Sequence, residues 1–432
     1  MRAINIGIVG AGTVGGGVIK ILSRKLPVFR QRLGLPLRLA RVADKVAERW
    51  QALPVGEAVC STGADELLAD DEIDIVVELI GGTTVAKDLI LRALERGKHV
   101  ITANKALIAE TGPVLFDAAK RAGVAFYFEA SVGGGMPAIK TIREALVGND
   151  VISIKTIING TCNYVLTQMA AHGWGFQQAL AEAQRLGYAE VDPTLDVSGH
   201  DAGHKVAIMA SLVHGGYVPF ERMDMEGITT ITAADIAVAQ ELGYCIRLLG
   251  IIRKDGENED VDVRVHPAFL HREHILASVS GVFNAVLLEG DAVGPILLYG
   301  RGAGELPTAS AVVSDIVDVA RNVLSGTPVR ISMDYYAHDN ALRLKPVEAI
   351  RSRYYLRFSV TDEPGVLAAI ATAFGRHGIS IASVMQKEEH PDYVPIIFLT
   401  HTAVEKGLRQ AVADVEKQDF VRGKTQVIRI ED

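Results

Sequence analysis

The stretch Ile4-Asn5-Ile6-Gly7-Ile8-Val9-Gly10-Ala11-Gly12-Thr13-Val14-Gly15 decides the fold of the first third of the chain. Its first six residues are typical of a buried strand, and the three glycines that follow have the spacing of a phosphate-binding turn that opens a helix. Such glycines permit the tight turn, the approach of the backbone to a pyrophosphate, and the packing of helix on strand. The helix N-terminus favours the phosphates. The stretch therefore predicts dinucleotide binding, with contacts at Gly10, Gly12, Thr13, Val14 and Gly15.

An acidic residue, Asp44, follows the second expected strand, Leu37–Ala43. A carboxylate in this position binds the adenine ribose 2′-hydroxyl and favours NAD. Asp44 lies further along the chain than the usual ~20 residues, which we interpret as an insertion at 27–36 after a helix over 14–26. Arg41 and Lys45 are close enough to accommodate a 2′-phosphate instead. The sequence leaves NAD and NADP both open.

Bulk composition restricts the class of protein. The chain has 432 residues, of which 49% are hydrophobic and 22% charged, so we expect a globular protein of two or three domains. A net charge of −8 argues against a nucleic acid partner. No apolar run approaches the roughly 20 residues of a membrane span, and Met1 leads almost directly into a strand rather than a signal peptide. Three scattered cysteines indicate reduced thiols, so we expect a cytoplasmic protein that meets no membrane.

The order of expected elements divides the chain into three parts. Residues 1–130 alternate strands and helices, which predicts an α/β domain with a Rossmann-type parallel sheet. An apolar helix near 306–325 is expected to return and complete it. Residues 131–305 are read as an α+β domain for catalysis and dimerisation. Residues 350–432 have the βαββαβ order of a small ferredoxin-like module, interpreted as an appended regulatory domain.

Three polar clusters are candidates for chemistry. The first, Thr102–Lys105, follows an apolar strand whose carboxyl end should border the ligand crevice, although a solvated loop lysine is an equal alternative. The second, Asn159–Tyr164, offers donors for a carboxylate or carbonyl, or is merely a turn. In the third, Gly187–Lys205, the side chains of Asp201 and Lys205 share one helical face. Since the helix continues with residues that look buried, we favour a functional pair over a surface ion pair.

Taken together, these motifs resemble the homoserine dehydrogenase family along essentially the whole chain. The matching pieces are Gly10–Gly15, Thr102–Lys105, Glu129–Pro137, Asn159–Thr161 and Ala183–Lys205. No aspartate kinase precedes them, so the chain resembles the monofunctional form, and the turn Asp362–Gly365 resembles that of an ACT domain. The resemblance implies reversible NAD(P)H-dependent reduction of L-aspartate 4-semialdehyde to L-homoserine, on the route to threonine, methionine and isoleucine.

The resemblance also implies roles for individual residues. Lys205 takes the acid/base role, because a lysine ammonium can stabilise and protonate the alkoxide that hydride transfer creates. Lys105 helps to hold the substrate and contacts the cofactor, and Asp201 completes the catalytic group. Substrate contacts are implied for Glu190, Asp201, Asp196, Thr161, Tyr188 and Lys105. Further cofactor contacts are implied for Asp44, Gly187 and Gly302, the last in a second glycine-rich loop, Gly300–Gly304.

A cation, an effector and an oligomer are further implications of the resemblance. The side chain of Glu129 and the carbonyls of Val132, Gly134 and Met136 are expected to bind a monovalent cation, sodium, although a plain turn is the alternative. The ACT-like module implies regulation by a small amino acid such as threonine, and the family implies a homodimer or homotetramer. Two other functions stay open: a different Rossmann oxidoreductase, or a sensor without turnover.

Overall fold

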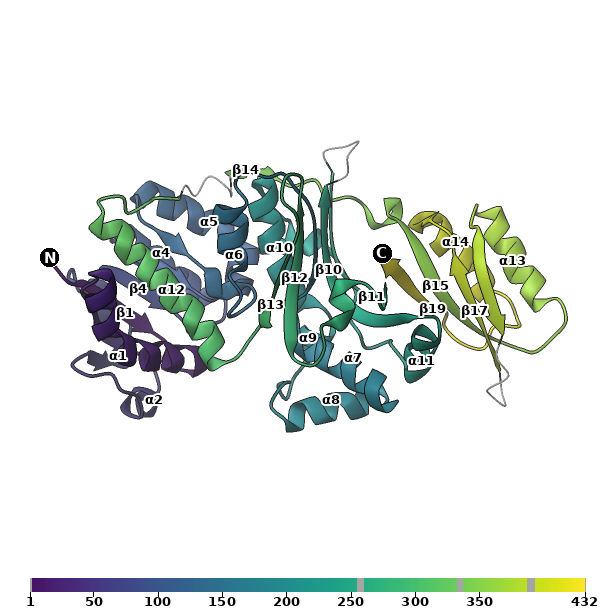
Figure 1. Cartoon of the computed structure of the whole chain (residues 1–432), viewed down its shortest axis with the longest axis horizontal. Coiled ribbons are helices and arrows are strands. Elements are labelled where there is room, and N and C mark those ends of the chain that lie inside the picture. The colour runs from purple at the N-terminus through teal and green to yellow at the C-terminus, as the bar shows by residue number, and fades with distance from the viewer. Residues whose placement is uncertain (1, 255–259, 332–336, 387–392, 432) are drawn as a thin grey trace.

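The computed structural model of the chain describes residues 2–254, 260–331, 337–386 and 393–431, which form three parts along the long axis (Figure 1). The first part contains the N-terminus, the central part is built on a long antiparallel sheet, and the third contains the C-terminal strands. None of the described helices is both long and apolar enough to cross a membrane.

The first part is a parallel sheet in the order β3-β2-β1-β4-β5-β6, which confirms the expected Rossmann-type fold. Residues of β1 alternate between two cores: Ile6 and Ile8 pack with α1 and α12 on one face, and Val9 packs with α4 and α5 on the other. The order reverses between β1 and β4, so a crevice opens at the carboxyl ends of these strands. The elements are β1 (Ile4–Val9), α1 (Thr13–Leu33), β2 (Leu37–Ala43), α2 (Ala47–Gln51), β3 (Val59–Ser61), α3 (Asp65–Ala69), β4 (Ile75–Glu78), α4 (Thr84–Glu95), β5 (His99–Thr102), α5 (Lys105–Ala122) and β6 (Phe126–Tyr127).

Helix α1 corrects one expectation about this domain. We expected a helix over 14–26 followed by an insertion, but the helix continues through Pro27 and ends before Gly34, whose backbone is left-handed. The apolar side chains of Leu22, Leu26 and Phe29 keep the same face on the core, so packing outweighs the hydrogen bond that the proline removes. The extra length is therefore helix rather than an inserted loop.

Helix α12 (Glu305–Leu324) returns from the central part to pack along α1. The two helices touch at Gly17, where a Cβ would lie 2.9 Å from the Cβ of Ala309. Only a glycine permits this approach, so the last of the three consecutive glycines of α1 serves helix packing.

The central part is an antiparallel sheet with helices on one face. Its elements are α6 (Ala138–Lys140), β7 (Val151–Ile157), α7 (Gly160–His172), α8 (Phe176–Arg185), α9 (Thr194–Val197), α10 (His200–His214), β8 (Gly216–Tyr217), β9 (Asp224–Met225), α11 (Ala233–Glu241), β10 (Tyr244–Lys254), β11 (Val261–His271), β12 (Phe283–Gly290), β13 (Gly294–Arg301) and β14 (Ala337–Ala341). Helix α10 lies very close to the sheet, since a Cβ on Gly250 would lie 2.3 Å from Val206. This packing buries most of α10, including Asp201 and Lys205.

The third part has the expected ferredoxin-like order, β19-β15-β17-β16. Its elements are β15 (Arg351–Val360), α13 (Val366–Arg376), β16 (Ile381–Gln386), β17 (Val394–Thr400), β18 (Ala403–Val404), α14 (Glu405–Glu416) and β19 (Gln426–Glu431). It is more than an appended module, because β19 pairs in parallel with β11 and the two sheets form one. Two ion pairs reinforce the joint: a buried one with Arg264 2.8 Å from Glu431, and a partly exposed one with Arg429 3.0 Å from Glu226.

Candidate active site

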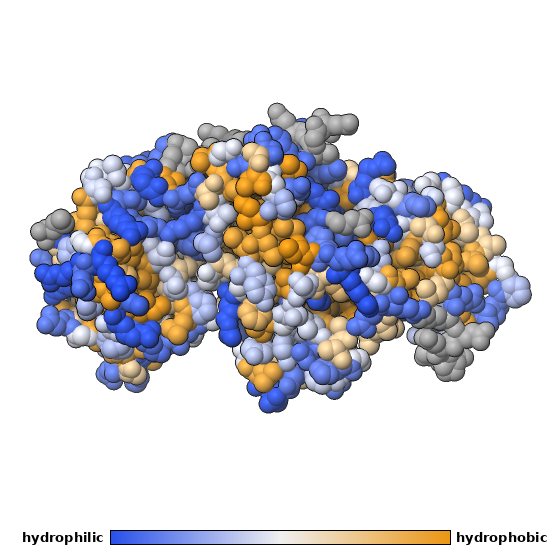
Figure 2. Space-filling model, viewed as in Figure 1, coloured by the Kyte–Doolittle hydropathy of each residue, from blue (hydrophilic) through white to orange (hydrophobic). Residues whose placement is uncertain are grey.

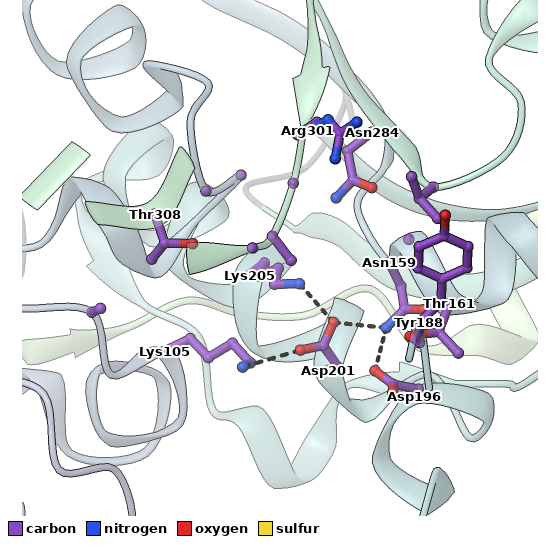
Figure 3. Close-up of a pocket in the computed structure, with 18 of the residues that line it drawn as sticks. Lys105, Asn159, Thr161, Tyr188, Asp196, Asp201, Lys205, Asn284, Arg301 and Thr308 are labelled. Atoms are coloured by element: carbon purple, nitrogen blue, oxygen red, sulfur yellow. Dashed lines mark hydrogen bonds and ion pairs between the residues drawn. The ribbon is translucent and has the colours of Figure 1, made fainter. Parts of the chain in front are cut away.

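A cavity of about 660 Å³ lies between the first domain and the central sheet. Its walls come from the glycine turn, the first residue of α5, the loop after Glu129, the first turn of α7, the loop before α9, helix α10 and the ends of β12 and β13. The predicted site residues that line it are Thr13, Val14, Lys105, Gly134, Thr161, Gly187, Tyr188, Glu190, Asp196, Asp201, Lys205 and Gly302. Segments nearly 300 residues apart therefore meet in one pocket, which Figure 3 shows.

Asp201 binds both lysines of the site (Figure 3). Its Oδ2 accepts a hydrogen bond from Lys205 Nζ at 2.6 Å, and its Oδ1 lies 3.2 Å from Lys105 Nζ. Lys205 also donates to the carbonyl of Ile158 at 2.9 Å. Burial by itself would raise the pKa of Asp201, but the two ammonium groups hold it well below its usual value. Because Asp201 and Lys205 are each only 8% exposed, they are not a solvated surface pair.

Asn159 connects Asp201 to a second carboxylate. Its Nδ2 donates to Asp196 Oδ1 at 2.7 Å and to Asp201 Oδ2 at 2.8 Å, while its Oδ1 accepts from the backbone N–H of Cys162 at 2.8 Å and caps α7. Burial, and then the charge of Asp201, raise the pKa of Asp196. The segment read as a possible plain turn therefore positions both acids of the cavity.

Lys105 is the first residue of α5, placed by a network at the carboxyl ends of β4 and β5. Asn104 caps the helix by accepting from Leu107 N–H at 3.2 Å, and its Nδ2 donates to the carbonyl of Gly82 at 2.6 Å. The fully buried Glu78 accepts from Thr102 Oγ1 at 2.6 Å. Lys105 thus reaches from the first domain to Asp201 on α10 and closes the cavity from that side.

The glycine turn has the geometry that a dinucleotide requires. Gly10 has a φ of +102°, and a Cβ on Gly15 would lie 1.9 Å from the carbonyl oxygen of Gly10. A side chain at Gly10 or Gly15 would therefore break the turn. Gly12 has open space beside it, and the nearest atom to a Cβ added there would belong to Arg49, 4.0 Å away. These residues fit the phosphate cradle that the sequence predicts.

Asp44 lies beside this turn but already has partners. Its carboxylate accepts from the N–H groups of Ala11 at 2.7 Å and Val46 at 2.9 Å, and Arg49 lies 3.3 Å away. Arg41, one of the two cations expected near a 2′-phosphate, instead forms an ion pair with Asp70 at 2.6 Å. Arg41 is therefore already paired with the residue that follows α3, whereas Arg49, which sequence reasoning missed, lies at the edge of the turn.

Glu129 is buried, 3% exposed, next to a second carboxylate. It accepts from the N–H groups of Ile139 at 3.0 Å and Lys140 at 2.9 Å, and its own N–H donates to Asp315 Oδ2 at 2.9 Å. Burial, followed by the neighbouring Asp315, raises the pKa of Glu129 to about 8, and burial raises the pKa of Asp315 to about 7. The loop that carries Val132, Gly134 and Met136 packs on the second glycine-rich loop, since a Cβ on Gly134 would lie 2.6 Å from the carbonyl of Gly302.

Several residues that line the cavity were missed from the sequence: Ser131, Asn284, Arg301 and Thr308. Asn284 lies in the strand Phe283–Gly290 and is 1% exposed. An amide within the otherwise apolar run Phe283–Leu288 is a signal that sequence reading could have used. Gly302, expected only as a cofactor contact, lies against it, since a Cβ there would come within 1.9 Å of Asn284 Nδ2.

Comparisons with known proteins agree with this geometry. A family model for homoserine dehydrogenase matches residues 137–317, a model for the homoserine dehydrogenase NAD-binding domain matches 10–129, and an ACT domain model matches 354–420. The chain is 43% identical to homoserine dehydrogenase of Neisseria gonorrhoeae and 44% identical to that of Pseudomonas aeruginosa, covering 100% of this chain and 99% of each relative.

Solved structures give the same result. The crystal structure of a homoserine dehydrogenase from Thiobacillus denitrificans is 44% identical, with a TM-score of 0.94 over 100% of this chain and 99% of that one. A hyperthermophilic archaeal homoserine dehydrogenase mutant in complex with NADPH is 27% identical, with a TM-score of 0.61 over 73% of this chain and 97% of that one. The chain therefore belongs to the homoserine dehydrogenase family of NAD(P)-dependent oxidoreductases, in the form that carries an ACT domain.

Proposed function

We propose that the protein catalyses the reversible reduction of L-aspartate 4-semialdehyde to L-homoserine in the cytoplasm, with NADP or NAD as the cofactor. The observation that carries the proposal is the bridge of Lys105, Asp201 and Lys205 inside the cavity next to the glycine turn. A sensor without turnover gives no reason to bury a lysine and an acid together at this place.

In this proposal Lys205 is the acid and base. The bound nicotinamide cofactor supplies or accepts the hydride. Lys205 Nζ has three donors, of which two are engaged by Asp201 and the carbonyl of Ile158, so the third is available to the reacting oxygen of the substrate. Nζ donates its proton to the alkoxide during reduction and takes a proton from the hydroxyl during oxidation.

Lys105 and Asp201 have different tasks. Lys105 contributes a second positive charge beside the same oxygen, which stabilises the alkoxide. Asp201 is a positioning carboxylate rather than a ligand of the substrate ammonium, because Lys105, Lys205 and Asn159 already occupy its two oxygens. The exposed Glu190 at the rim is the better partner for the ammonium, with Asp196, Thr161 and Tyr188 around it.

Purified protein should reduce NADP⁺ or NAD⁺ when L-homoserine is added, with the semialdehyde as product. Lys205→Met should lower kcat at least about 100-fold, since general acid–base catalysis is worth ~10²–10⁴, while the Kd for the cofactor stays within about threefold. Lys25→Met, an exposed lysine on α1, is the matched control and should leave kcat unchanged. Absence of turnover with both cofactors would refute the proposed reaction.

We also propose that a monovalent cation, sodium, is held by the Glu129 carboxylate and the carbonyls of Val132, Gly134 and Met136. The buried pair of Glu129 and Asp315 supports this, because burial raises the pKa of both carboxyls and Asp315 Oδ1 has no hydrogen-bond partner among the described residues. A cation there would stabilise the loop that packs on Gly302 and thereby the floor of the cavity.

The assembly and its regulation are proposals of the same kind. Figure 2 shows apolar residues gathered at the centre of one face, over the region of β12 and β13 in Figure 1. Half-exposed apolar side chains such as Ile152 and Tyr299 belong to this region of the sheet. A homodimer or homotetramer through this face would cover them, and light scattering tests it. Threonine is the proposed effector at the ACT domain, and its titration against activity tests that.

A further inference from the structure

Asn284 is a buried amide at the cavity that the roles above do not use. It is 1% exposed, and its Oδ1 has no hydrogen-bond partner among the described residues. A buried acceptor without a partner costs stability. Asn284 also lines the cavity, and in Figure 3 its amide end points from β12 into it. An amide kept in such a position is therefore expected to find its partners in a ligand.

The surrounding structure holds Asn284 in place. In the sheet, Asn284 pairs with Gly300 of β13. Asn163 anchors the segment that leads into β12, because its Nδ2 donates to the carbonyls of Val279, Gly281 and Phe283 at 3.1 to 3.3 Å. Glycines flank the amide: a Cβ on Gly302 would lie 1.9 Å from its Nδ2, and a Cβ on Gly160 would lie 3.5 Å from its Oδ1. The fold thus leaves space for this amide and orients it rigidly.

The amide lies on the substrate side of the cavity. Figure 3 shows Asn284 and Arg301 together on the side of Thr161 and Tyr188, away from Thr308 of α12, the helix that packs on the cofactor domain. The first turn of α7 borders the same side with Gly160 and Thr161, and the first N–H groups of a helix have no partner within it. Arg301 adds a guanidinium at the mouth. This side therefore combines donors for an anion with one orphan acceptor for a cation.

An α-amino acid has the complementary pair of groups. We propose that Asn284 determines specificity by binding the α-carbon end of the substrate. Its Nδ2 donates to the α-carboxylate, which Arg301 also binds, and its Oδ1 accepts one N–H of the α-ammonium, whose charge Glu190 balances. The inference rests on the proposed function: if the reacting oxygen binds at Lys205, the opposite end of the substrate reaches β12. It explains why Gly302 must lack a side chain independently of any cofactor contact.

The test uses two ligands that differ only in the group that Asn284 is proposed to recognise. L-2-aminobutyrate has the α-carboxylate and lacks the reacting hydroxyl. L-2-aminobutanamide also lacks the hydroxyl and has a neutral carboxamide in place of the carboxylate. Calorimetry on the full-length protein saturated with NADP⁺ gives Kd for each. Asn284→Asp should weaken the acid at least about 30-fold, because like charges then face each other, and should leave the amide within about threefold. Arg301→Gln, at an exposed position, should weaken the acid about tenfold by loss of a charge-assisted bond.

Asn322→Asp is the matched control, since Asn322 is a buried asparagine on α12 that bonds to Tyr127 Oη outside the cavity. It should leave the ratio of the two Kd values unchanged. The inference is overturned if Asn284→Asp and Arg301→Gln, both folded as judged by Tm, keep the wild-type ratio, or if they weaken NADP⁺ instead. Since calorimetry needs no turnover, a wild-type protein that binds the acid but does not oxidise L-homoserine would refute the proposed reaction and not the role of Asn284.

Discussion

Replacing Asp201 by asparagine should both destabilise the protein and lower its activity, because stability and activity each depend on the negative charge of Asp201. The substitution keeps the shape of the side chain and removes the charge that lies 2.6 Å from Lys205 and 3.2 Å from Lys105. Two ammonium groups are then left close together at a site where Asp201 and Lys205 are each 8% exposed. Breaking a buried ion pair on one side costs ~3–5 kcal/mol.

This cost can be translated into measurable quantities. At roughly 2–4 °C per kcal/mol for a domain of this size, Asp201→Asn should lower Tm by about 6–20 °C. It should also lower kcat about 100-fold, because Lys205 loses the group that orients it. The pKa of Asp201 is held below its ordinary 3.8, so its stabilisation is present above that pH and is lost only as the pH falls further. The difference in Tm from wild type should therefore be constant between about pH 5 and 8.

A double-mutant cycle separates charge from packing. The single variant Lys205→Met leaves Asp201 paired with Lys105. The double variant, which combines Asp201→Asn with Lys205→Met, leaves Lys105 as the only charge of the three, and the side chain of Lys105 is 40% exposed. The double variant should thus be more stable than Asp201→Asn, while kcat stays low in both. Differential scanning calorimetry and the L-homoserine assay give the two readouts, and Glu182→Gln, in an exposed ion pair with Arg185, is the control. Equal stability of Asp201→Asn and wild type, or a double variant less stable than Asp201→Asn, would refute the reasoning.

Three further predictions follow from other parts of the molecule. Arg49→Gln should raise the KM for NADP⁺ about tenfold and leave the KM for NAD⁺ unchanged, because a charge-assisted bond to a 2′-phosphate is worth ~1.5–3 kcal/mol. Arg41→Gln is the control, since Arg41 is paired with Asp70. Equal effects of Arg49→Gln on both cofactors would contradict the prediction. The pKa of Glu129 is raised from 4.5 to about 8, so its contribution to stability is present below 4.5 and lost as the pH rises through 8. Tm near pH 9 should accordingly increase with sodium chloride but not choline chloride, and Glu129→Gln should abolish the difference. A chain that ends at residue 345 should aggregate rather than act as an unregulated enzyme, because it exposes the edge of β11 that β19 covers; a stable, active truncated chain would disprove this.

The features that sequence reading predicted correctly depend on residues close together in the chain. The turn at Gly10 needs a strand before it and a helix after it, and all three are written in one short stretch. The ferredoxin-like order of the C-terminal part is likewise legible from its alternating strands and helices. Asp201 and Lys205 are one helical turn apart, so their pairing followed from the period of the helix.

Errors arose where contacts between distant segments decide. Nothing near Pro27 shows that Leu26 and Phe29 pack on the core that α1 shares with α12, which is what continues the helix. Likewise nothing near Arg41 shows that Asp70 will engage it. The local pattern was sound in both cases, but the energy that selects the conformation comes from a partner elsewhere in the chain.

The sequence by itself determined a Rossmann domain, a ferredoxin-like end and a list of polar residues suited to reducing an aldehyde. The tertiary structure alone decided that Lys105 and Lys205 share one carboxylate, that β19 joins the two sheets, and that Asn284 lines the cavity. The physical reason is the range of the interactions. Backbone geometry and helical or strand periodicity act over a few residues, whereas ion pairs, sheet pairing and buried amides depend on folding that brings together segments distant in the sequence.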